Sequence, residues 1–98
     1  MVMFDLPVET KKQRGQYTRF RNHLLKESFT GFQYSVYLRF CGSMHNLEAA
    51  KKRVLARLPP EGKVTFLIIT DRQFGLMENY YCGQEAEKPK PTQQLELF

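Results

Sequence analysis

The sequence has few cysteines, few histidines and no long apolar run, and each of these absences excludes a class of protein. Cys41 and Cys82 stand far apart and form no CxxC pair, which predicts a reduced, cytoplasmic protein whose cysteines are small core residues. His23 and His45 lack the paired spacing of a structural zinc site. The longest aliphatic run, Phe66–Ile69, is far too short to span a bilayer, and no secretory segment is visible. We therefore expect no membrane partner.

Acidic residues are also in the minority, with 10 Asp and Glu against 15 Lys and Arg and a net charge of +5. A dimer would carry twice this excess, enough to concentrate polyanions such as nucleic acids around it. The 98 residues suffice for one compact domain. A domain of this size buries a modest fraction of its surface, and pairing with a second copy is a common remedy. The charge therefore indicates a nucleic-acid partner only if the cations share one surface.

Hydrophobic patterning predicts that strands and helices alternate along the chain. The expected elements are a strand over Met1–Leu6, a helix from near Lys11 to about Ser28, one bent strand or two strands over 32–41, a helix from Asn46 to Leu58, and a strand over Val64–Thr70. This order predicts an α+β fold, a ferredoxin-like split βαβ sandwich with both helices on one face of the sheet. That fold hosts many functions and selects none of them.

The first predicted helix has the clearest local signals. Thr10 and Gln13 have the spacing of a capping box, which fixes the start of the helix. Tyr17, Phe20 and Leu24 repeat at helical spacing and form its apolar stripe. We expect this stripe to pack on the sheet.

The end of the chain differs in composition from the rest. Met77–Cys82, with its paired tyrosines, predicts an extra C-terminal strand. Beyond it, Glu85–Thr92 is charged and contains proline, as is typical of a linker with little to bury. The sequence thus predicts a ferredoxin-like domain over residues 1–83 and a linker with a docking tail over residues 84–98.

The tail ends in the apolar residues Leu95 and Leu97, which alternate with polar ones, and Phe98, which directly follows Leu97. Such a segment adds readily as a strand to an exposed sheet edge, where alternate side chains fill pockets. It also resembles the short motif with which bacterial proteins bind the replication sliding clamp. We favour docking on the protein's own dimer or on a partner protein.

Asp5 is the first candidate for chemistry, since it is a carboxylate in an apolar run at the end of a predicted strand. Mg²⁺, or Mn²⁺ in its place, often needs only one or two carboxylates beside water and phosphate. A bound cation would polarise a phosphodiester and activate water. One chain supplies a poor site, because Glu9 is the only acid nearby in sequence. A twofold axis close to Asp5 would add a second carboxylate, so the metal interpretation predicts a homodimer. In the alternative, Asp5 caps the turn at Pro7 or the helix that follows.

The first predicted helix also carries the candidate nucleic-acid contacts. Lys12, Arg19 and Lys26 are seven residues apart and fall almost opposite the apolar stripe, on the face expected to meet solvent. Arg14 and Arg21 lie nearer that stripe, where a guanidinium reaches phosphate from a partly shielded position. No acid is interleaved among them, which favours phosphate contact over an ordinary solvated face. Such contacts position a duplex without reading its bases. The aromatic-glycine motif of RNA-recognition sheets is absent.

Five segments, in this order and spacing, resemble the Cas-two family of CRISPR-associated endoribonucleases, especially those of type II systems. They are Met3–Val8 (MFDLPV), the basic helix containing Tyr17–Arg21, the strand Gln33–Tyr37 (QYSVY), Gly62–Val64 before the aliphatic strand, and Thr70–Phe74 after it. The resemblance covers nearly the whole chain up to Gly83.

This resemblance implies a homodimeric, ferredoxin-like adaptation protein that acts in spacer acquisition. Its dimer would bridge subunits of the CRISPR integrase and contact the incoming double-stranded DNA. Asp5 matches the signature aspartate of the family, which faces its symmetry mate, and so inherits the role of Mg²⁺ or Mn²⁺ ligand and candidate catalytic group. The family also implies a phosphodiesterase activity that its members retain inconsistently. The alternative is a toxin-like, metal-dependent endonuclease that acts on RNA or DNA independently of integration.

Overall fold

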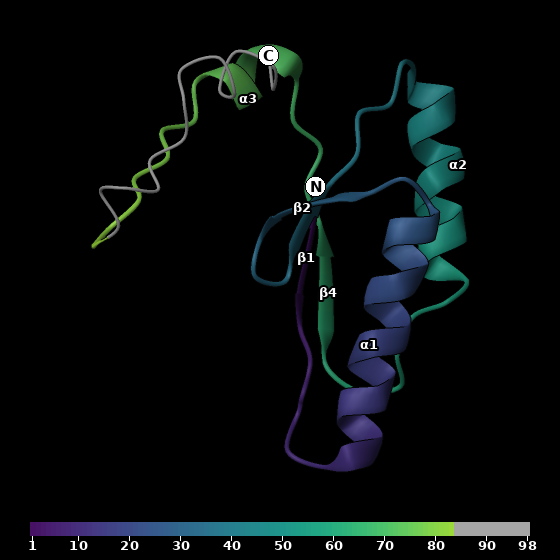
Figure 1. The fold of residues 1–98 in the computed structure, drawn as a ribbon. Coiled ribbons are helices and arrows are strands. Elements are labelled where there is room, and N and C mark those ends of the chain that lie inside the picture. Colours follow the sequence, from purple (N-terminus) through teal and green to yellow (C-terminus); the bar gives the residue numbers. More distant parts are fainter. Residues whose placement is uncertain (84–98) are drawn as a thin grey trace. The chain divides into compact units, whose positions relative to one another are not determined.

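Residues 1–83 are described by a computed structural model (Figure 1). The chain divides into two compact units, Met1–Leu67 and a second that begins at Ile68, and each is described by itself. The first unit contains strands and helices in alternation. They are β1 (Val2–Asp5), α1 (Lys11–Lys26), β2 (Thr30–Gln33), β3 (Val36–Leu38), α2 (Met44–Leu55) and β4 (Lys63–Phe66).

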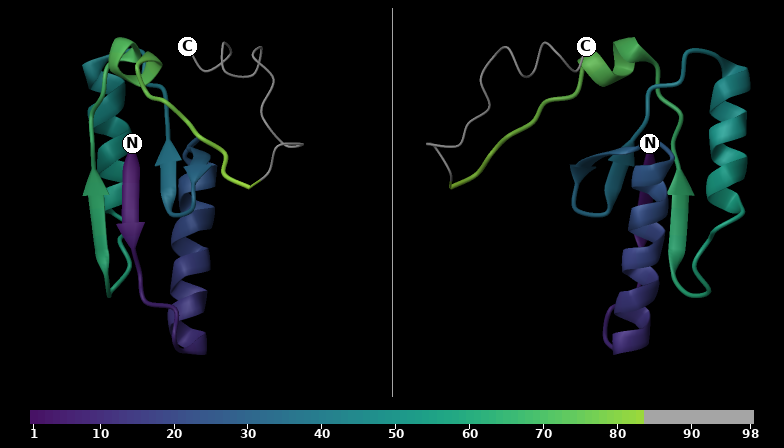
Figure 2. Two further views of the ribbon diagram at one scale, coloured as in Figure 1. Left: turned by 90° about the vertical axis from the view of Figure 1, so that its left-hand side faces the viewer. Right: turned by 45° about the vertical axis from the view of Figure 1, so that its right-hand side comes forward.

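The four strands form one antiparallel sheet in the order β2-β3-β1-β4. Helices α1 and α2 lie on the same face of this sheet, and no helix of the first unit covers the other face (Figure 1 and Figure 2). The predicted α+β class is confirmed, and the strand order is compatible with the predicted ferredoxin-like arrangement. No helix within residues 1–83 is both long and apolar enough to cross a membrane.

Helix α1 begins where the capping box predicts. The N–H of Gln13 donates to Oγ1 of Thr10 at 3.1 Å, while the N–H of Thr10 donates to Oε1 of Gln13 at 3.0 Å. These two bonds satisfy backbone donors that a helix start otherwise leaves without partners. The helix ends at Lys26, close to the predicted Ser28, which adopts a left-handed φ of 68°.

The core lies between α1, α2 and the sheet. Phe4 of β1 is at its centre, with its ring edge-on to Phe20 at 5.2 Å and stacked on Tyr37 at 5.7 Å between centroids. Phe20, Leu24 and Val54 supply the helical side of this cluster and are almost fully buried. The apolar stripe predicted for α1 therefore packs on the sheet, where aromatic pairs add to the area that they bury.

Of the two alternatives for residues 32–41, the two-strand one is confirmed, because Ser35 adopts a φ of 60° and turns the chain between β2 and β3. Several predicted boundaries are wrong. The hairpin spans residues 30–38 rather than 32–41. Helix α2 is capped by Ser43, whose Oγ accepts from the N–H of Asn46 at 3.1 Å, so Asn46 is the third helical residue and not the cap. It ends before Leu58. Strand β4 stops at Phe66 and does not reach Thr70.

The second unit contains the short helix α3 (Asp71–Gly75), which begins with a capping box of Thr70 and Gln73. The strand predicted over Met77–Cys82 is absent, because a strand requires backbone pairing and no described strand pairs with this segment. The extra C-terminal strand is thus not formed within residues 1–83. The predicted docking residues Leu95, Leu97 and Phe98 lie outside the described residues, and the division at residue 83 stays a prediction.

The cysteines do not occupy the core. Cys41 is half-buried and Cys82 is exposed, so the prediction that both act as core hydrophobes is wrong. Both are free thiols.

Alanine substitutions at two glycines are expected to change the stability of the protein in opposite directions. A Cβ at Gly62, where φ is +98°, would lie 2.6 Å from the carbonyl oxygen of Asp5, whereas a Cβ at Gly15 in α1 meets nothing within 4 Å. Gly62→Ala is expected to destabilise the protein by at least about 1–3 kcal/mol, from backbone strain alone. Gly15→Ala is expected to stabilise it by up to about 1 kcal/mol. Urea unfolding measures both, and equal midpoints for the two variants would contradict this account.

Candidate nucleic-acid interface

The solvent face of α1 carries three cations without partners. Lys12, Arg19 and Lys26 are all exposed, and within residues 1–83 no hydrogen bond or ion pair involves their side chains. Phe20 and Leu24, on the sheet side of the same helix, are almost fully buried. We call Lys12, Arg19 and Lys26 the α1 cation row. Its position agrees with the sequence pattern, and its role in binding stays a prediction.

Arg14 and Arg21 are exposed but already bonded within the protein. Arg14 Nη1 donates to the carbonyl oxygens of Val8 and Glu9, at 3.1 Å and 3.0 Å, and so holds the segment that leads from β1 into α1. Arg21 Nε donates to the hydroxyl of buried Tyr37 at 3.0 Å. Both arginines therefore have a structural role. A contact with nucleic acid is left to their remaining N–H groups.

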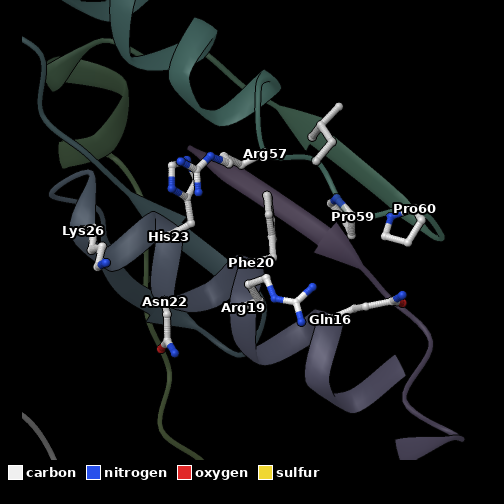
Figure 3. Close-up of a pocket in the computed structure, with 10 residues that line it drawn as sticks. Gln16, Arg19, Phe20, Asn22, His23, Lys26, Arg57, Pro59 and Pro60 are labelled. Carbon is white, nitrogen blue, oxygen red and sulfur yellow. The ribbon is translucent and has the colours of Figure 1, made fainter. Parts of the chain in front are cut away.

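A pocket opens beside the α1 cation row, between α1 and the loop after α2, and encloses about 240 Å³ (Figure 3). Arg19, His23 and Lys26 line it from α1, and Arg57 lines it from the loop, followed by the Pro59–Pro60 pair. The sequence pattern of α1 did not identify Arg57, because this residue is distant in the chain and has no helical periodicity with α1.

Asp5 lies at the end of β1 and is exposed. It pairs with Lys63 of β4, and residues paired across antiparallel strands point to the same face of a sheet. Across the described residues, no ion pair joins the Asp5 carboxylate to Lys63 or to another cation. Within residues 1–83 no three His, Cys, Asp or Glu side chains gather to hold a metal ion. Whether Asp5 takes part in a divalent site stays a prediction.

The sheet face that carries Asp5 is apolar at its centre. Met3 pairs with Val36 on one side and with Thr65 on the other, so these three side chains share the face that no helix of the first unit covers. Leu38 follows two residues after Val36, on the same side. All four are half-buried. We call Met3, Val36, Leu38 and Thr65 the open sheet face.

An aromatic pair lies near the β2–β3 turn. Tyr17 and Tyr34 are stacked with 6.1 Å between ring centroids, and the Tyr17 hydroxyl is 3.1 Å from Oγ of Ser35. Burial raises the pKa of the Tyr17 phenol, and the hydrogen bond with Ser35 opposes this shift in part. The phenol is therefore neutral at physiological pH, which suits a structural hydroxyl and not a nucleophile.

Comparison with known proteins decides the family. The family model described as "CRISPR associated protein Cas2" matches residues 1–77. The chain belongs to this family. Proteins named "CRISPR-associated endoribonuclease Cas2" from three bacteria illustrate the similarity. The protein from Flavobacterium psychrophilum is 49% identical over 98 residues, which cover 100% of this chain and 85% of the relative.

The second, from Parvibaculum lavamentivorans, is 46% identical over 98 residues, covering 100% of this chain and 97% of the relative. The third, from Ligilactobacillus salivarius, is 44% identical over 88 residues, covering 90% of this chain and 86% of the relative. The resemblance seen in the sequence is thus confirmed. The five resembling segments also have visible structural roles: Thr70–Phe74, for example, begins with the capping box of α3.

Proposed function

We propose that this Cas2-family protein is a cytoplasmic CRISPR adaptation protein whose homodimer bridges subunits of the integrase and binds incoming double-stranded DNA. The observation that carries the proposal is the α1 cation row, three exposed side chains that no carboxylate within residues 1–83 neutralises. Free cations at spacings of seven residues along one helix face match the need to hold a phosphate backbone without reading its bases.

The homodimer is supported by the open sheet face. Half-buried apolar side chains such as Met3, Val36 and Leu38 alternate along their strands with the core residues that face α1 and α2, and so lie on the opposite side of the sheet. A small domain gains stability when such a surface is buried against a second copy. Pairing through this face leaves the α1 cation rows of both copies pointing outward, toward DNA.

Pairing through this face also bears on the metal. Asp5 lies on the open side of the sheet, so a twofold axis near it would bring two Asp5 carboxylates together. Two carboxylates beside water and phosphate suffice for Mg²⁺ or Mn²⁺. Such a cation would polarise a phosphodiester and lower the pKa of a bound water. The second carboxylate would also offset the positive charge of Lys63.

Reconstituted integration tests the proposal. The purified protein, its integrase, a prespacer duplex and a plasmid bearing the CRISPR array are incubated with Mg²⁺, and integrated product is measured on gels. We expect integration to require this protein and to be saturated at one homodimer per bridged assembly. Full integration by the integrase alone would contradict bridging.

The second candidate function is a metal-dependent endonuclease of RNA or DNA that acts independently of integration. The name "endoribonuclease" carried by the relatives favours it, as does the exposed position of Asp5. Cleavage and bridging make different demands on the chain, because cleavage requires the Asp5 carboxylate and bridging requires the cations of α1.

A further inference from the structure

The pocket between α1 and the loop after α2 concentrates positive charge. Arg19, Lys26 and Arg57 line it together with His23, and none of its lining residues is acidic. Across residues 1–83, these three cations have no hydrogen-bonded or ionic partner. Like charges that share a pocket raise the local potential and attract an anion. We call this site the α1–loop pocket.

The acid nearest in sequence is not available to neutralise the pocket. Glu27 forms an ion pair with Arg53, and its backbone carbonyl accepts from Arg39 Nη1 at 2.8 Å. The pocket cations are thus separated from the carboxylate that follows Lys26. Glu61, which follows Pro60, accepts from Gln13 Nε2 at 3.0 Å and forms no ion pair with the pocket cations. The three cations thus have no carboxylate partner within residues 1–83, and an external anion would supply one.

The pocket is held in shape from both sides. His23 Nε2 is 3.0 Å from the carbonyl oxygen of Arg53, and since a carbonyl only accepts, the ring nitrogen donates and ties α1 to the end of α2. Pro59 and Pro60 then restrict the loop that carries Arg57. A site whose parts are fixed before binding loses less entropy when the ligand arrives.

The helix dipole explains these cations only in part. Lys26 and Arg57 lie at the C-terminal ends of α1 and α2, where the dipole favours positive charge. Arg19 lies two turns before the end of α1, beyond the reach of that effect. The helix dipole therefore does not account for Arg19.

The size of the pocket selects the ligand class. A volume of about 240 Å³ lies below the roughly 300–1,000 Å³ of pockets that enclose drug-sized molecules and leaves ample room for one phosphate group. Two guanidinium groups suit the oxygens of a phosphate, which they bind through pairs of N–H groups.

We propose that the α1–loop pocket holds one backbone phosphate of the duplex that lies along α1, with Arg57 as a contact from outside that helix. The proposal rests on the proposed function for its ligand, because Arg19 and Lys26 belong both to the pocket and to the α1 cation row. The proposal adds Arg57 to the DNA-binding residues and assigns one backbone phosphate to the α1–loop pocket.

Arg57→Gln tests the proposal, with Lys52→Gln as the matched control, because Lys52 is an exposed cation of α2 that does not line the pocket. Duplex affinity is measured by fluorescence anisotropy at several salt concentrations. We expect Arg57→Gln to weaken binding about tenfold and to reduce the slope of log K against log salt by about 0.9 for each occupied pocket. Lys52→Gln should keep the wild-type slope. Equal slopes for both variants and the wild type would overturn the proposal.

Inorganic phosphate, added at constant ionic strength, separates the two possible sources of the anion. In wild type we expect it to shift the NMR signals of His23 and Asn22, and in Arg57→Gln to shift them far less. Shifts in wild type together with an unchanged salt slope in Arg57→Gln would mean that the pocket binds free phosphate and not DNA, which also overturns the assignment. If inorganic phosphate shifts these signals in wild type but not in Arg57→Gln, while DNA still binds after reversal of the whole cation row, the anion site stands, but the proposed function of α1 and the assignment of the anion to DNA both fail.

Discussion

Changing Lys12, Arg19 and Lys26 together to glutamate is expected to abolish duplex binding and spacer integration. Each exchange lowers the charge by two, so the chain changes from +5 to about −1. The reversed row would repel the phosphates that we propose it holds, and six substitutions per dimer should lower the affinity at least about a thousandfold. Anisotropy with a labelled duplex measures binding, and the integration assay measures the consequence.

The triple glutamine variant serves as the control for this result. Lys12, Arg19 and Lys26 are exposed and without partners in the described part of the chain, so neither triple variant should unfold the protein. Neutralisation should weaken DNA binding less than reversal does, and it should lower the salt dependence. Unaltered integration by the glutamate variant would refute the proposed role of α1.

Asp5→Asn is expected to abolish metal-dependent cleavage, wherever wild type shows it, and to leave integration intact. The amide keeps the shape of the side chain but removes the charge that a divalent cation requires. Without that charge the cation should not be held, and the rate should fall to the background measured without Mg²⁺. Cleavage of labelled RNA and DNA with and without Mg²⁺ measures the first effect, and the integration assay measures the second.

Glu48→Gln provides the matched control for Asp5→Asn, because Glu48 is an exposed acid of α2, on the helical side of the sheet. It should cleave as wild type does. Equal residual cleavage by wild type and Asp5→Asn would indicate a contaminating nuclease. Loss of integration in Asp5→Asn, in a variant that still folds and dimerises, would show that the scaffold role also depends on this carboxylate.

Local sequence signals were sufficient for α1. A capping box needs only Thr10 and Gln13, and an apolar stripe at helical spacing needs only a few turns of one helix. The position of Lys12, Arg19 and Lys26 on the solvent face followed from the same geometry. Such features depend on residues that are near in sequence, and a single sequence displays them.

Other features were predicted only in part or wrongly. The sequence left one bent strand or two strands open over 32–41, because the turn that separates β2 from β3 uses a left-handed φ at Ser35 rather than at a glycine or asparagine. The strand predicted over Met77–Cys82 had suitable residues but no described strand to pair with. Ser43 and Asn46 are both good capping residues, and the pattern alone did not choose between them.

The candidate site was likewise predictable only in those features that depend on residues near in sequence. The sequence placed Asp5 at a strand end but not opposite Lys63, since only the register of β1 and β4 brings the two together. Arg57 joins Arg19 through the packing of a loop on α1, and the requirement for Gly62 comes from its approach to the backbone of Asp5. In both cases the two residues are distant in the sequence and are brought together only by the folded structure.

Sedimentation equilibrium of the wild-type protein, at the micromolar concentrations used for integration, tests most directly whether two copies associate. The account predicts a single species of twice the chain mass of 11.6 kDa, as association through the open sheet face requires. A species with the mass of one chain across that range would contradict it, since the paired Asp5 carboxylates and the outward-facing cation rows both depend on the dimer.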